Sequence, residues 1–376
     1  MTVRGREGRI KVLFATGLLA GGGAERVVVR ILRRLDRDRF VPALLLLEKR
    51  GAFLADVPGD VPVLDCGRRA AGGRLAWLRN FARLLREERP DVLVSFLWFT
   101  NVAATFARFA AGARCRLIVS ERSTIEGSRE GFVTELARRA GIRLLYRFAD
   151  RVVPNSEALG RQLVERFGIP APKVAVLPNP VDIEAIAALA GRGAEAPASD
   201  AVPVIAGMGR LSREKGFDLL VRAMADVRPG ARLVLAGEGP ERGALGDLAG
   251  RLGVAGRVEF AGFLANPYPV LANAAVFVLP SRYEGFPNAL VEAMSLGVPC
   301  VAARCPTGPD EIVTDGVDGL LVPAEDPPGL AAAINRLLDD APLRDRLGRA
   351  ARQRARAYDA AAVVPRFEAL LAEVTA

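Results

Sequence analysis

Short apolar runs of strand length alternate with longer segments of helical period along the whole chain, and this alternation constrains the fold more than any other feature. It is typical of βαβ units, whose parallel strands are buried on both faces and therefore read as continuous apolar runs. The pattern occurs twice. The expected strands are Lys11–Thr16, Ala43–Leu47, Val61–Leu64, Val92–Phe96, Leu117–Ser120 and Arg151–Pro154 in the first half, and Val204–Met208, Arg232–Ala236, Val258–Phe260, Val276–Pro280 and Pro299–Ala302 in the second.

Two doubly wound, Rossmann-like domains are expected in a chain of 376 residues, because a single core stops growing near about 250–300 residues. Residues 191–200, GRGAEAPASD, lack apolar periodicity and are typical of a linker. We expect an N-terminal domain at 1–190, a second domain at 201–357, and a C-terminal helix at 358–376 that packs back on the first domain. The two domains would face each other across a cleft, with ligands outside the carboxyl ends of the strands.

The composition indicates a globular protein, with 51% hydrophobic and 25% charged residues. No apolar stretch reaches the roughly 18 residues of a membrane span, and Met1–Arg9 is polar and basic, so we expect a cytoplasmic protein. The four cysteines form no C-x-x-C pair, and the chain has no histidine, which removes the usual partner in a zinc site. We interpret the cysteines as small buried hydrophobes or reduced thiols, and we expect neither a metal nor a cofactor.

The net charge of +9 favours anionic partners. Phosphorylated small molecules, anionic lipid head groups and nucleic acid all remain open on charge alone, as does the alternative that most arginines simply lie on solvated helix faces. No recognisable nucleic-acid-binding motif accompanies the charge.

Three glycine-containing loops follow expected strands. The first, residues 21–25, contains Gly22 and Gly23 directly before an amphipathic helix, where backbone amides can hold a phosphate; a tight turn would also need glycine. The second, residues 209–216, places Arg210 and Lys215 at a strand end, and this pair of cations suits a diphosphate leaving group. The third carries Gly237 and Glu238 at the same expected sheet edge.

Residues 281–294 form the most informative segment, because they follow an apolar strand, break at Gly285 and begin a helix near Pro287. Glu284 then lies in the loop and Glu292 lies inside the helix, so the two carboxylates can reach different parts of one ligand. A buried charge is costly, so Glu292 must meet either a polar ligand or protein donors. The amides at the helix start would point at an anion; they belong to Asn288, Ala289 and Leu290.

Glu284 and Glu292 match the E-x7-E motif, and the chain resembles the retaining glycosyltransferases called family four, whose architecture is termed GT-B. The similarity runs over nearly the whole chain, through the GGGAE, PNPVD, GRLSxEKG, GEGP, FAGF, PSxxEGFP and DGxxGLLV segments. The resemblance implies that Arg210 and Lys215 bind the donor diphosphate, Glu284 the donor sugar and Glu292 the ribose. It also implies that Phe263 flanks the nucleobase, that Gly22 and Gly23 approach the phosphate, and that the donor is a UDP- or GDP-linked sugar.

One departure concerns the reacting centre, where many relatives carry a histidine. Here the strand Leu117–Ser120 runs into Glu121 and Arg122 instead, a variant similar to that of bacterial transferases that build lipid-linked or surface glycans. Glu121 either pairs with Arg122 or touches the acceptor. By resemblance, the reaction is a front-side attack in which the leaving phosphate takes the acceptor proton, and catalysis is mostly positioning and charge stabilisation.

The acceptor side carries aromatic residues and a basic helical segment in the first domain. Residues 136–147 interleave arginines with leucines, which suits either an anionic membrane surface or an ordinary helix packed on the sheet. The D-x-D of Asp36–Asp38 ends a helix in a polar turn, so we interpret it as solvated rather than metal-binding. The rival functions are a nucleotide-sugar epimerase or phosphorylase of the same architecture and a non-catalytic anion-binding protein.

Overall fold

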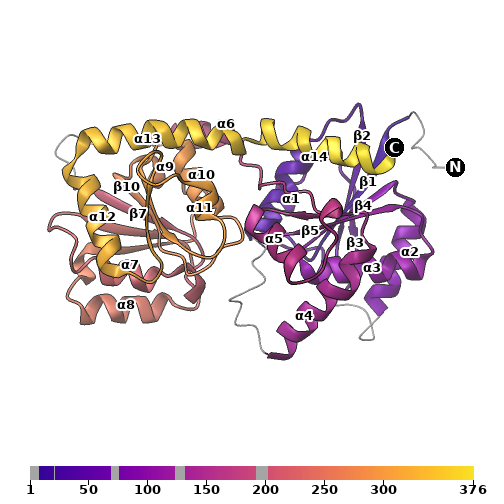
Figure 1. Ribbon diagram of the computed structural model, residues 1–376, viewed down its shortest axis with the longest axis horizontal. Coiled ribbons are helices and arrows are strands. Elements are labelled where there is room, and N and C mark those ends of the chain that lie inside the picture. The colour runs from indigo at the N-terminus through magenta and orange to yellow at the C-terminus, as the bar shows by residue number, and fades with distance from the viewer. Residues whose placement is uncertain (1–7, 21, 69–75, 123–131, 192–201) are drawn as a thin grey trace. The chain divides into compact units, whose positions relative to one another are not determined.

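The computed structural model describes residues 8–20, 22–68, 76–122, 132–191 and 202–376. The chain forms two compact units, one comprising residues 1–180 and 360–376 and the other residues 181–359 (Figure 1). No helix in the described ranges is long and apolar enough to cross a membrane.

The first unit contains a six-stranded parallel sheet in the order β3-β2-β1-β4-β5-β6. The chain adds β2 and β3 on one side of β1 and then adds β4 to β6 on its other side. The direction in which strands are added therefore reverses between β1 and β4. The strand bounds are β1 Ile10–Thr16, β2 Phe40–Leu46, β3 Val63–Asp65, β4 Val92–Phe96, β5 Arg116–Glu121 and β6 Arg151–Pro154.

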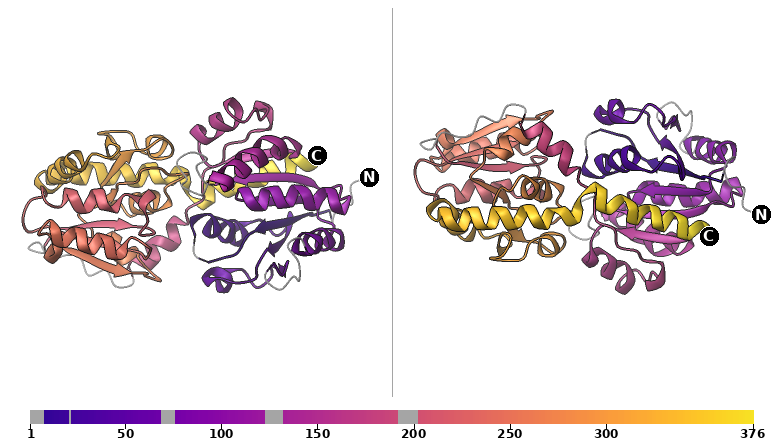
Figure 2. Two further views of the ribbon diagram at one scale, coloured as in Figure 1. Left: turned by 90° about the horizontal axis from the view of Figure 1, so that it is seen from below. Right: turned by 90° about the horizontal axis from the view of Figure 1, so that it is seen from above.

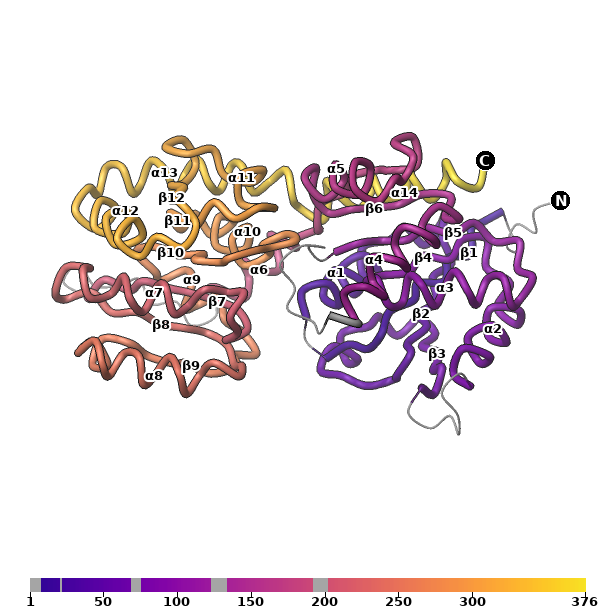
Figure 3. The backbone as a smooth tube through the Cα atoms, turned by 60° about the horizontal axis from the view of Figure 1, so that its bottom comes forward, coloured from indigo at the N-terminus to yellow at the C-terminus, as the bar shows by residue number. Residues whose placement is uncertain are grey.

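The second unit repeats the plan, with a six-stranded parallel sheet in the order β12-β11-β10-β7-β8-β9. Figure 3 shows these strands following one another in this order across the unit. Their bounds are β7 Val204–Met208, β8 Arg232–Ala236, β9 Val258–Gly262, β10 Val276–Leu279, β11 Cys300–Arg304 and β12 Leu320–Pro323. Two Rossmann-like units are thereby confirmed, and β12 is the one strand that the apolar runs had not indicated.

Helices cover both faces of each sheet (Figure 2). The first unit contains α1 Gly23–Arg34, α2 Ala76–Glu88, α3 Trp98–Ala111, α4 Phe132–Leu145, α5 Glu157–Glu165 and α14 Ala360–Thr375. The second contains α6 Ile183–Gly191, α7 Phe217–Ala223, α8 Arg242–Arg251, α9 Tyr268–Ala272, α10 Asn288–Ser295, α11 Pro309–Ile312, α12 Pro327–Asp339 and α13 Ala341–Ala355. Side-chain caps fix some of the helix starts, as where Asp340 accepts the amide of Leu343 at 2.9 Å.

Each sheet has an apolar core on both of its faces, because alternate strand residues point to opposite sides. In the first unit Leu13 and Phe14 are both fully buried and belong to different clusters. In the second unit Ile205 and Ala206 are divided in the same way. All four cysteines are buried free thiols, and burial raises the pKa of Cys115 to about 11.

The division between the units differs from the linker expected at 191–200. Helix α6 lies in the second unit, where it packs on α9 and α10 and buries Ile186 and Ala190 in the core. The chain therefore leaves the first unit after Pro180, and residues 192–201 lie outside the described residues. The composition of residues 191–200 does not reveal that the helix before them packs in the core of the second unit.

The last helix, α14, belongs to the first unit. It packs on α1, and the ring of Phe367 lies 6.1 Å from the ring of Phe14 in the core. Glu368 accepts the backbone amide of Asp36 at 2.7 Å. The chain end is thus held by apolar packing and by a hydrogen bond at the end of α1.

Candidate active site

An ion pair lies where β7 and β10, neighbours in the second sheet, reach their carboxyl ends. The ammonium of Lys215 donates to the carboxylate Oε1 of Glu284 at 2.6 Å, although the residues are 69 positions apart. The Lys215 side chain is 25% exposed and that of Glu284 is 6% exposed. A cation that remains open to solvent is thus fixed next to a buried acid, which suits a site that holds an anionic ligand.

Close backbone contact fixes the position of Lys215. The residue ends a 3-10 turn, Arg213–Lys215, and is followed by Gly216 with φ +64°. A Cβ at Gly216 would lie 2.1 Å from the carbonyl oxygen of Pro280 at the end of β10. Only glycine permits this approach, so the loop after β7 is held directly on the loop that carries Glu284.

Hydroxyl groups on both sides fix Glu284. Ser281 donates to its Oε1 at 2.7 Å, and Thr307 donates to its backbone carbonyl. Gly308, at φ +98°, lies against Glu284 and Pro287, where a Cβ would approach Pro287 to 2.9 Å. Thr307 and Gly308 were missed in the sequence, because only the adjacency of β10 and β11 brings them to this loop.

A second ion pair ties the two loops together beside the first. The guanidinium of Arg282 makes two hydrogen bonds to the carboxylate of Asp218, at 2.7 and 2.8 Å. These bonds raise the pKa of Arg282. Burial alone would raise the pKa of Asp218, but the hydrogen bonds and the positive charge of Arg282, with smaller contributions from a backbone hydrogen bond and Arg222, together lower that pKa. This paired geometry rigidifies the start of α7 against the loop after β10.

The glycine loops after β7 and β8 also lie in backbone contact. The amide of Leu211 donates to the carbonyl of Glu238 at 3.0 Å. Gly237, at φ +144°, has no room for a side chain, since its Cβ would lie 1.9 Å from the carbonyl oxygen of Gly209. On these loops Arg210 and Glu238 are exposed, and Glu238 lies 3.5 Å from Arg242. The expected donor-loop residues thus lie on adjoining loops at one sheet edge.

Helix α10 begins after Pro287 and carries Glu292, which is 2% exposed. The amide of Asn288 donates to Phe286 and that of Leu290 to Pro287, both at 3.0 Å. The turn therefore uses two of the three amides that were expected to face an anion, the third being that of Ala289. Gly285, half-buried, precedes the turn.

Phe263 follows β9 and is 64% exposed, the largest exposed fraction among the large hydrophobic side chains that the structure describes. The loop that carries it adjoins the glycine loop after β8, because Gly237 donates to the carbonyl of Gly262 at 2.8 Å. An aromatic ring exposed beside the expected donor loops is available for stacking on a flat ligand group.

In the first unit, Gly22 and Gly23 stand at the start of α1, both exposed. Glu25 closes this start by accepting the amide of Gly22 at 3.2 Å. A Cβ at Gly22 would lie 3.5 Å or more from its neighbours, which is ordinary contact, so packing does not require glycine there. Gly21 of this loop lies outside the described residues.

Glu121, at the end of β5, is fully buried. Its Oε2 accepts from the hydroxyl of Tyr146 at 2.6 Å, and Asn101 donates to the same hydroxyl at 2.8 Å. Burial, followed by the charge of Glu121, raises the pKa of Tyr146 well above its usual value. Tyr146 lies on the 3-10 turn after α4 and Asn101 lies on α3, so this network joins β5 to α3 and to that turn.

Arg122 is also buried, at 7% exposure. Its guanidinium donates to the hydroxyl of Ser120 at 2.7 Å, and to the carbonyl of Leu177 and the side chain of Asn179 at 2.9 Å each. Burial lowers the pKa of Arg122 to about 9, and the nearby charge of Glu121 acts in the opposite direction. The guanidinium stays charged at neutral pH and fastens the chain just before it leaves this unit.

The D-x-D segment forms a turn in which Asp36 accepts the amide of Asp38 at 2.8 Å. Arg37 pairs with Asp60 at 2.5 Å. Within the described ranges no group of three or more acidic or cysteine side chains is placed to hold a metal ion.

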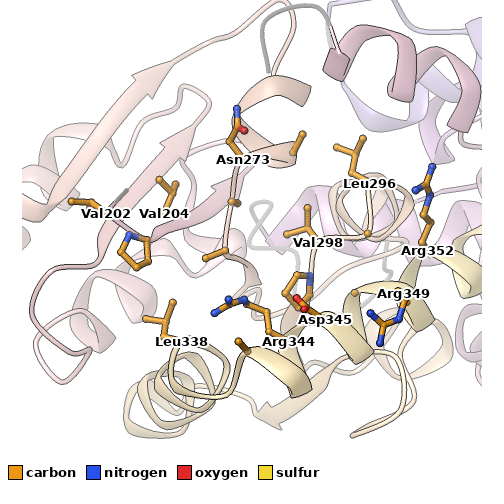
Figure 4. A pocket seen from close by; sticks show the side chains of 18 of the residues that line it. Val202, Val204, Asn273, Leu296, Val298, Leu338, Arg344, Asp345, Arg349 and Arg352 are labelled. Carbon is orange, nitrogen blue, oxygen red and sulfur yellow. The ribbon is translucent and has the colours of Figure 1, made fainter. Parts of the chain in front are cut away.

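A cavity of about 1170 Å³ opens at the other edge of the second sheet, where β7, β10 and β11 begin (Figure 4). Arginines from α13 and from the start of β8 line it, but Arg228 pairs with Asp339 at 2.7 Å and Arg232 with Glu259 at 2.9 Å. None of the sequence-predicted site residues lines this cavity. The cavity lies at the edge where the strands begin, whereas ligands of parallel sheets bind where the strands end.

Two Rossmann-like units, the second with a charged, glycine-lined edge, match the architecture of the GT-B glycosyltransferases. The family described as "Glycosyltransferase Family 4" matches residues 21–185, and the family described as "Glycosyl transferases group 1" matches residues 202–340. The chain therefore belongs to the glycosyltransferases that these two descriptions cover, one in each half of the chain.

Relatives and solved structures agree with this assignment. The N-acetylgalactosamine-N,N'-diacetylbacillosaminyl-diphospho-undecaprenol 4-alpha-N-acetylgalactosaminyltransferase of Campylobacter jejuni is 30% identical, over 91% of this chain and 93% of its own. The lipopolysaccharide core biosynthesis glycosyltransferase LpsE of Rhizobium meliloti is 30% identical, over 87% and 88%. The structure of Anabaena HepE in complex with UDP-glucose has a TM-score of 0.83 at 26% identity, covering 97% of this chain and 100% of that one.

Proposed function

We propose that this glycosyltransferase moves a sugar from a UDP- or GDP-linked donor to a glycan or lipid-linked acceptor, with retention of the anomeric configuration. The carrying observation is the 2.6 Å contact between Lys215 and Glu284. The bond that breaks joins the sugar to the diphosphate, so a site for this reaction needs a group for the sugar beside a cation for the leaving phosphate. The two side chains satisfy that requirement.

Charge supports the donor assignment. Negative charge grows on the diphosphate as the bond breaks, and preorganised cations stabilise that charge without reorganisation. Arg210 is exposed and Lys215 is a quarter exposed, so both are accessible to a ligand at this edge. The resemblance assigns the diphosphate to these two cations, and their places on one loop agree with that assignment.

The remaining donor contacts fall on neighbouring loops. Glu292 would bind the ribose and Phe263 would flank the nucleobase. Gly237, Glu238 and the turn from Gly285 to Leu290 would line the diphosphate and sugar. The Anabaena relative is described in complex with UDP-glucose, which supports a nucleotide-sugar donor for this chain.

In the proposed reaction an acceptor hydroxyl oxygen bonds to the anomeric carbon as the bond from that carbon to the phosphate oxygen breaks. The departing electron pair stays on the diphosphate, whose oxygen takes the acceptor proton on the same face. No side chain needs to form a covalent intermediate, so catalysis consists of positioning and electrostatic stabilisation.

The names of the relatives support a lipid-linked or surface-glycan acceptor, since one describes a diphospho-undecaprenol substrate and another lipopolysaccharide core synthesis. An enzyme that uses such acceptors would work in the cytoplasm, at the inner face of the membrane. Glu121 and Arg122 would serve the acceptor side by holding Tyr146 and the segment at Leu177–Asn179, because both charged groups are buried.

A thermal-shift panel of nucleoside diphosphates and nucleotide sugars tests the donor, because a ligand that binds only the native state raises the unfolding temperature by mass action. A shift with UDP or GDP and their sugars is expected, and it should be lost in Lys215→Ala. Arg213→Ala is the matched control, since it removes an exposed cation from the same turn. If no ligand of the panel raises the unfolding temperature of the wild type, the donor proposal is wrong.

Product analysis with the donor alone separates transfer from the rival chemistry of the same architecture. A transferase leaves the donor sugar intact until an acceptor is added, apart from slow hydrolysis. An epimerase converts the sugar with no acceptor present, and that result would replace the proposed function.

A further inference from the structure

Exposed large hydrophobic side chains gather on one part of the first unit. Of the nine among the described residues, five lie on α3, α4 and the 3-10 turn Tyr146–Phe148 that follows α4. Their exposed fractions run from 43% to 58%, and they are Phe106, Phe109, Leu136, Leu144 and Phe148. Single exposed hydrophobics are ordinary, but a cluster on adjoining elements indicates an interaction surface.

Close packing joins α3 and α4. A Cβ on Gly141 of α4 would lie 2.8 Å from the side chain of Val102 on α3, so the absence of a side chain lets the helices approach. The rings of Phe109 and Phe148 meet edge to face at 5.3 Å, although both remain largely exposed. The aromatic side chains of α3 and of the turn after α4 are therefore neighbours.

The two sides of α4 differ in chemistry. Arg138, Ile142 and Tyr146 are buried at four-residue spacing along the segment. The opposite side exposes Leu136, Arg139, Arg143 and Leu144, and the segment ends with exposed Arg147 and Phe148. Arg147 lies over the ring of Phe148, 5.1 Å from its centre, so cation and ring are exposed together. Packing on the sheet thus uses one side of α4 and leaves a basic, apolar side uncovered.

We propose that this surface, formed by the five hydrophobic side chains with Arg139, Arg143 and Arg147, is a docking face for an anionic lipid bilayer. Aromatic rings and leucines can enter the boundary between head groups and acyl chains while the guanidinium groups meet lipid phosphates. Charge complementarity selects this occupant, since exposed arginines outnumber the one acid of the segment, Glu135, which pairs with Arg139 at 2.7 Å.

The proposal deepens the proposed function, because a lipid-linked acceptor lies in such a bilayer, but its test does not depend on sugar transfer. Flotation of the full chain with vesicles of phosphatidylglycerol and phosphatidylcholine in equal parts measures binding directly. Vesicles of phosphatidylcholine alone isolate the charge requirement. The wild type should float with the anionic vesicles, and more weakly at high salt, which screens the attraction.

Two double variants distinguish binding through this face from attraction by the net charge of the protein. Arg143→Glu with Arg147→Glu should weaken binding at least about tenfold. Arg349→Glu with Arg352→Glu makes the same charge change on exposed positions of α13 and should leave most binding intact. Phe109→Ser should also weaken binding, whereas Val317→Ser, at a comparably exposed apolar position of the second unit, should not.

Equal loss in the two charge-reversed variants would show that net charge alone attracts the protein, and it would overturn the docking face. So would a wild type that stays with the soluble fraction, or one that self-associates through this face instead. Transfer to a water-soluble acceptor analogue, measured in parallel, reports on the proposed function by itself. If this transfer persists in a protein that does not bind vesicles, only the docking face is rejected.

Discussion

The ammonium nitrogen of Lys215 lies 2.6 Å from Oε1 of Glu284, which also accepts from Ser281 at 2.7 Å. A buried carboxylate oxygen therefore has two donors, one charged and one neutral. The charged donor is the one that remains partly open to solvent.

Replacing Lys215 by alanine should lower kcat/KM by roughly 100–1000-fold, about 3 kcal/mol in transition-state stabilisation, because a charge facing the leaving diphosphate is lost. Glu284→Gln should cause a loss of similar size while keeping a hydrogen-bonding side chain in place. Steady-state kinetics with a saturating acceptor measure both. Wild-type turnover in the two variants, with Arg213→Ala as the control, would refute the assignment of this pair.

Gly237→Ala tests the contact between the loops after β7 and β8. A Cβ there would overlap the carbonyl of Gly209 in a backbone region that disfavours side chains, so we expect a loss of at least about 2 kcal/mol in the free energy of unfolding. Gly243→Ala in α8 meets nothing within 4 Å and should instead stabilise by about 0.5–1 kcal/mol. Denaturant unfolding compares the stabilities of the two variants. Equal unfolding midpoints would contradict the close packing of Gly237 against Gly209.

The Asp218–Arg282 pair should make stability depend on acid pH. Folding lowers the pKa of Asp218 from the ordinary value of 3.8, so its contribution is fully present above that value and is lost as the pH falls through the lower, folded pKa. Asp218→Asn should therefore reduce the unfolding temperature at neutral pH, and the difference from wild type should shrink in acid. The exposed Asp339→Asn change serves as control. A difference that stays constant across the acid range would reject the linkage.

Tyr146→Phe removes the hydroxyl that joins Glu121 and Asn101 inside the first unit. The buried carboxylate oxygen and the amide each lose a partner, so we expect a loss of about 1–3 kcal/mol in the free energy of unfolding. Glu121→Gln should cost less, because the glutamine oxygen can still accept from Tyr146. Calorimetry of both variants gives the comparison, and a neutral Tyr146→Phe would show that water replaces the lost bond.

Most of the fold could be predicted because apolar runs report burial on both faces of a parallel sheet. All eleven expected strands are present within a few residues of their expected bounds. The strand that was missed, β12, follows the tight turn at Asp315–Gly319 and has only four residues, Leu320–Pro323, at the far edge of its sheet. Its length does not explain the miss, since β6 and β10 also have four residues and were expected.

The candidate site could be predicted in part. Spacing placed Lys215 and Glu284 at strand ends, but nothing in the spacing indicates that their side chains touch. Arg282 stood inside the most informative segment without a role, because its partner Asp218 is 64 positions away. Glu121 appeared as an acceptor-side acid, and its burial against Tyr146 became visible only in the structure.

By itself the sequence determined two Rossmann-like units and the loops that carry charge, since hydrophobic periodicity and loop chemistry are properties of residues near one another along the chain. The tertiary structure decided which strands became neighbours, and therefore which distant side chains share a site. It also decided that α6 belongs with the second unit. The physical reason is that partner choice for a buried charge, or for an apolar helix face, depends on chain crossovers that bring together residues far apart in sequence.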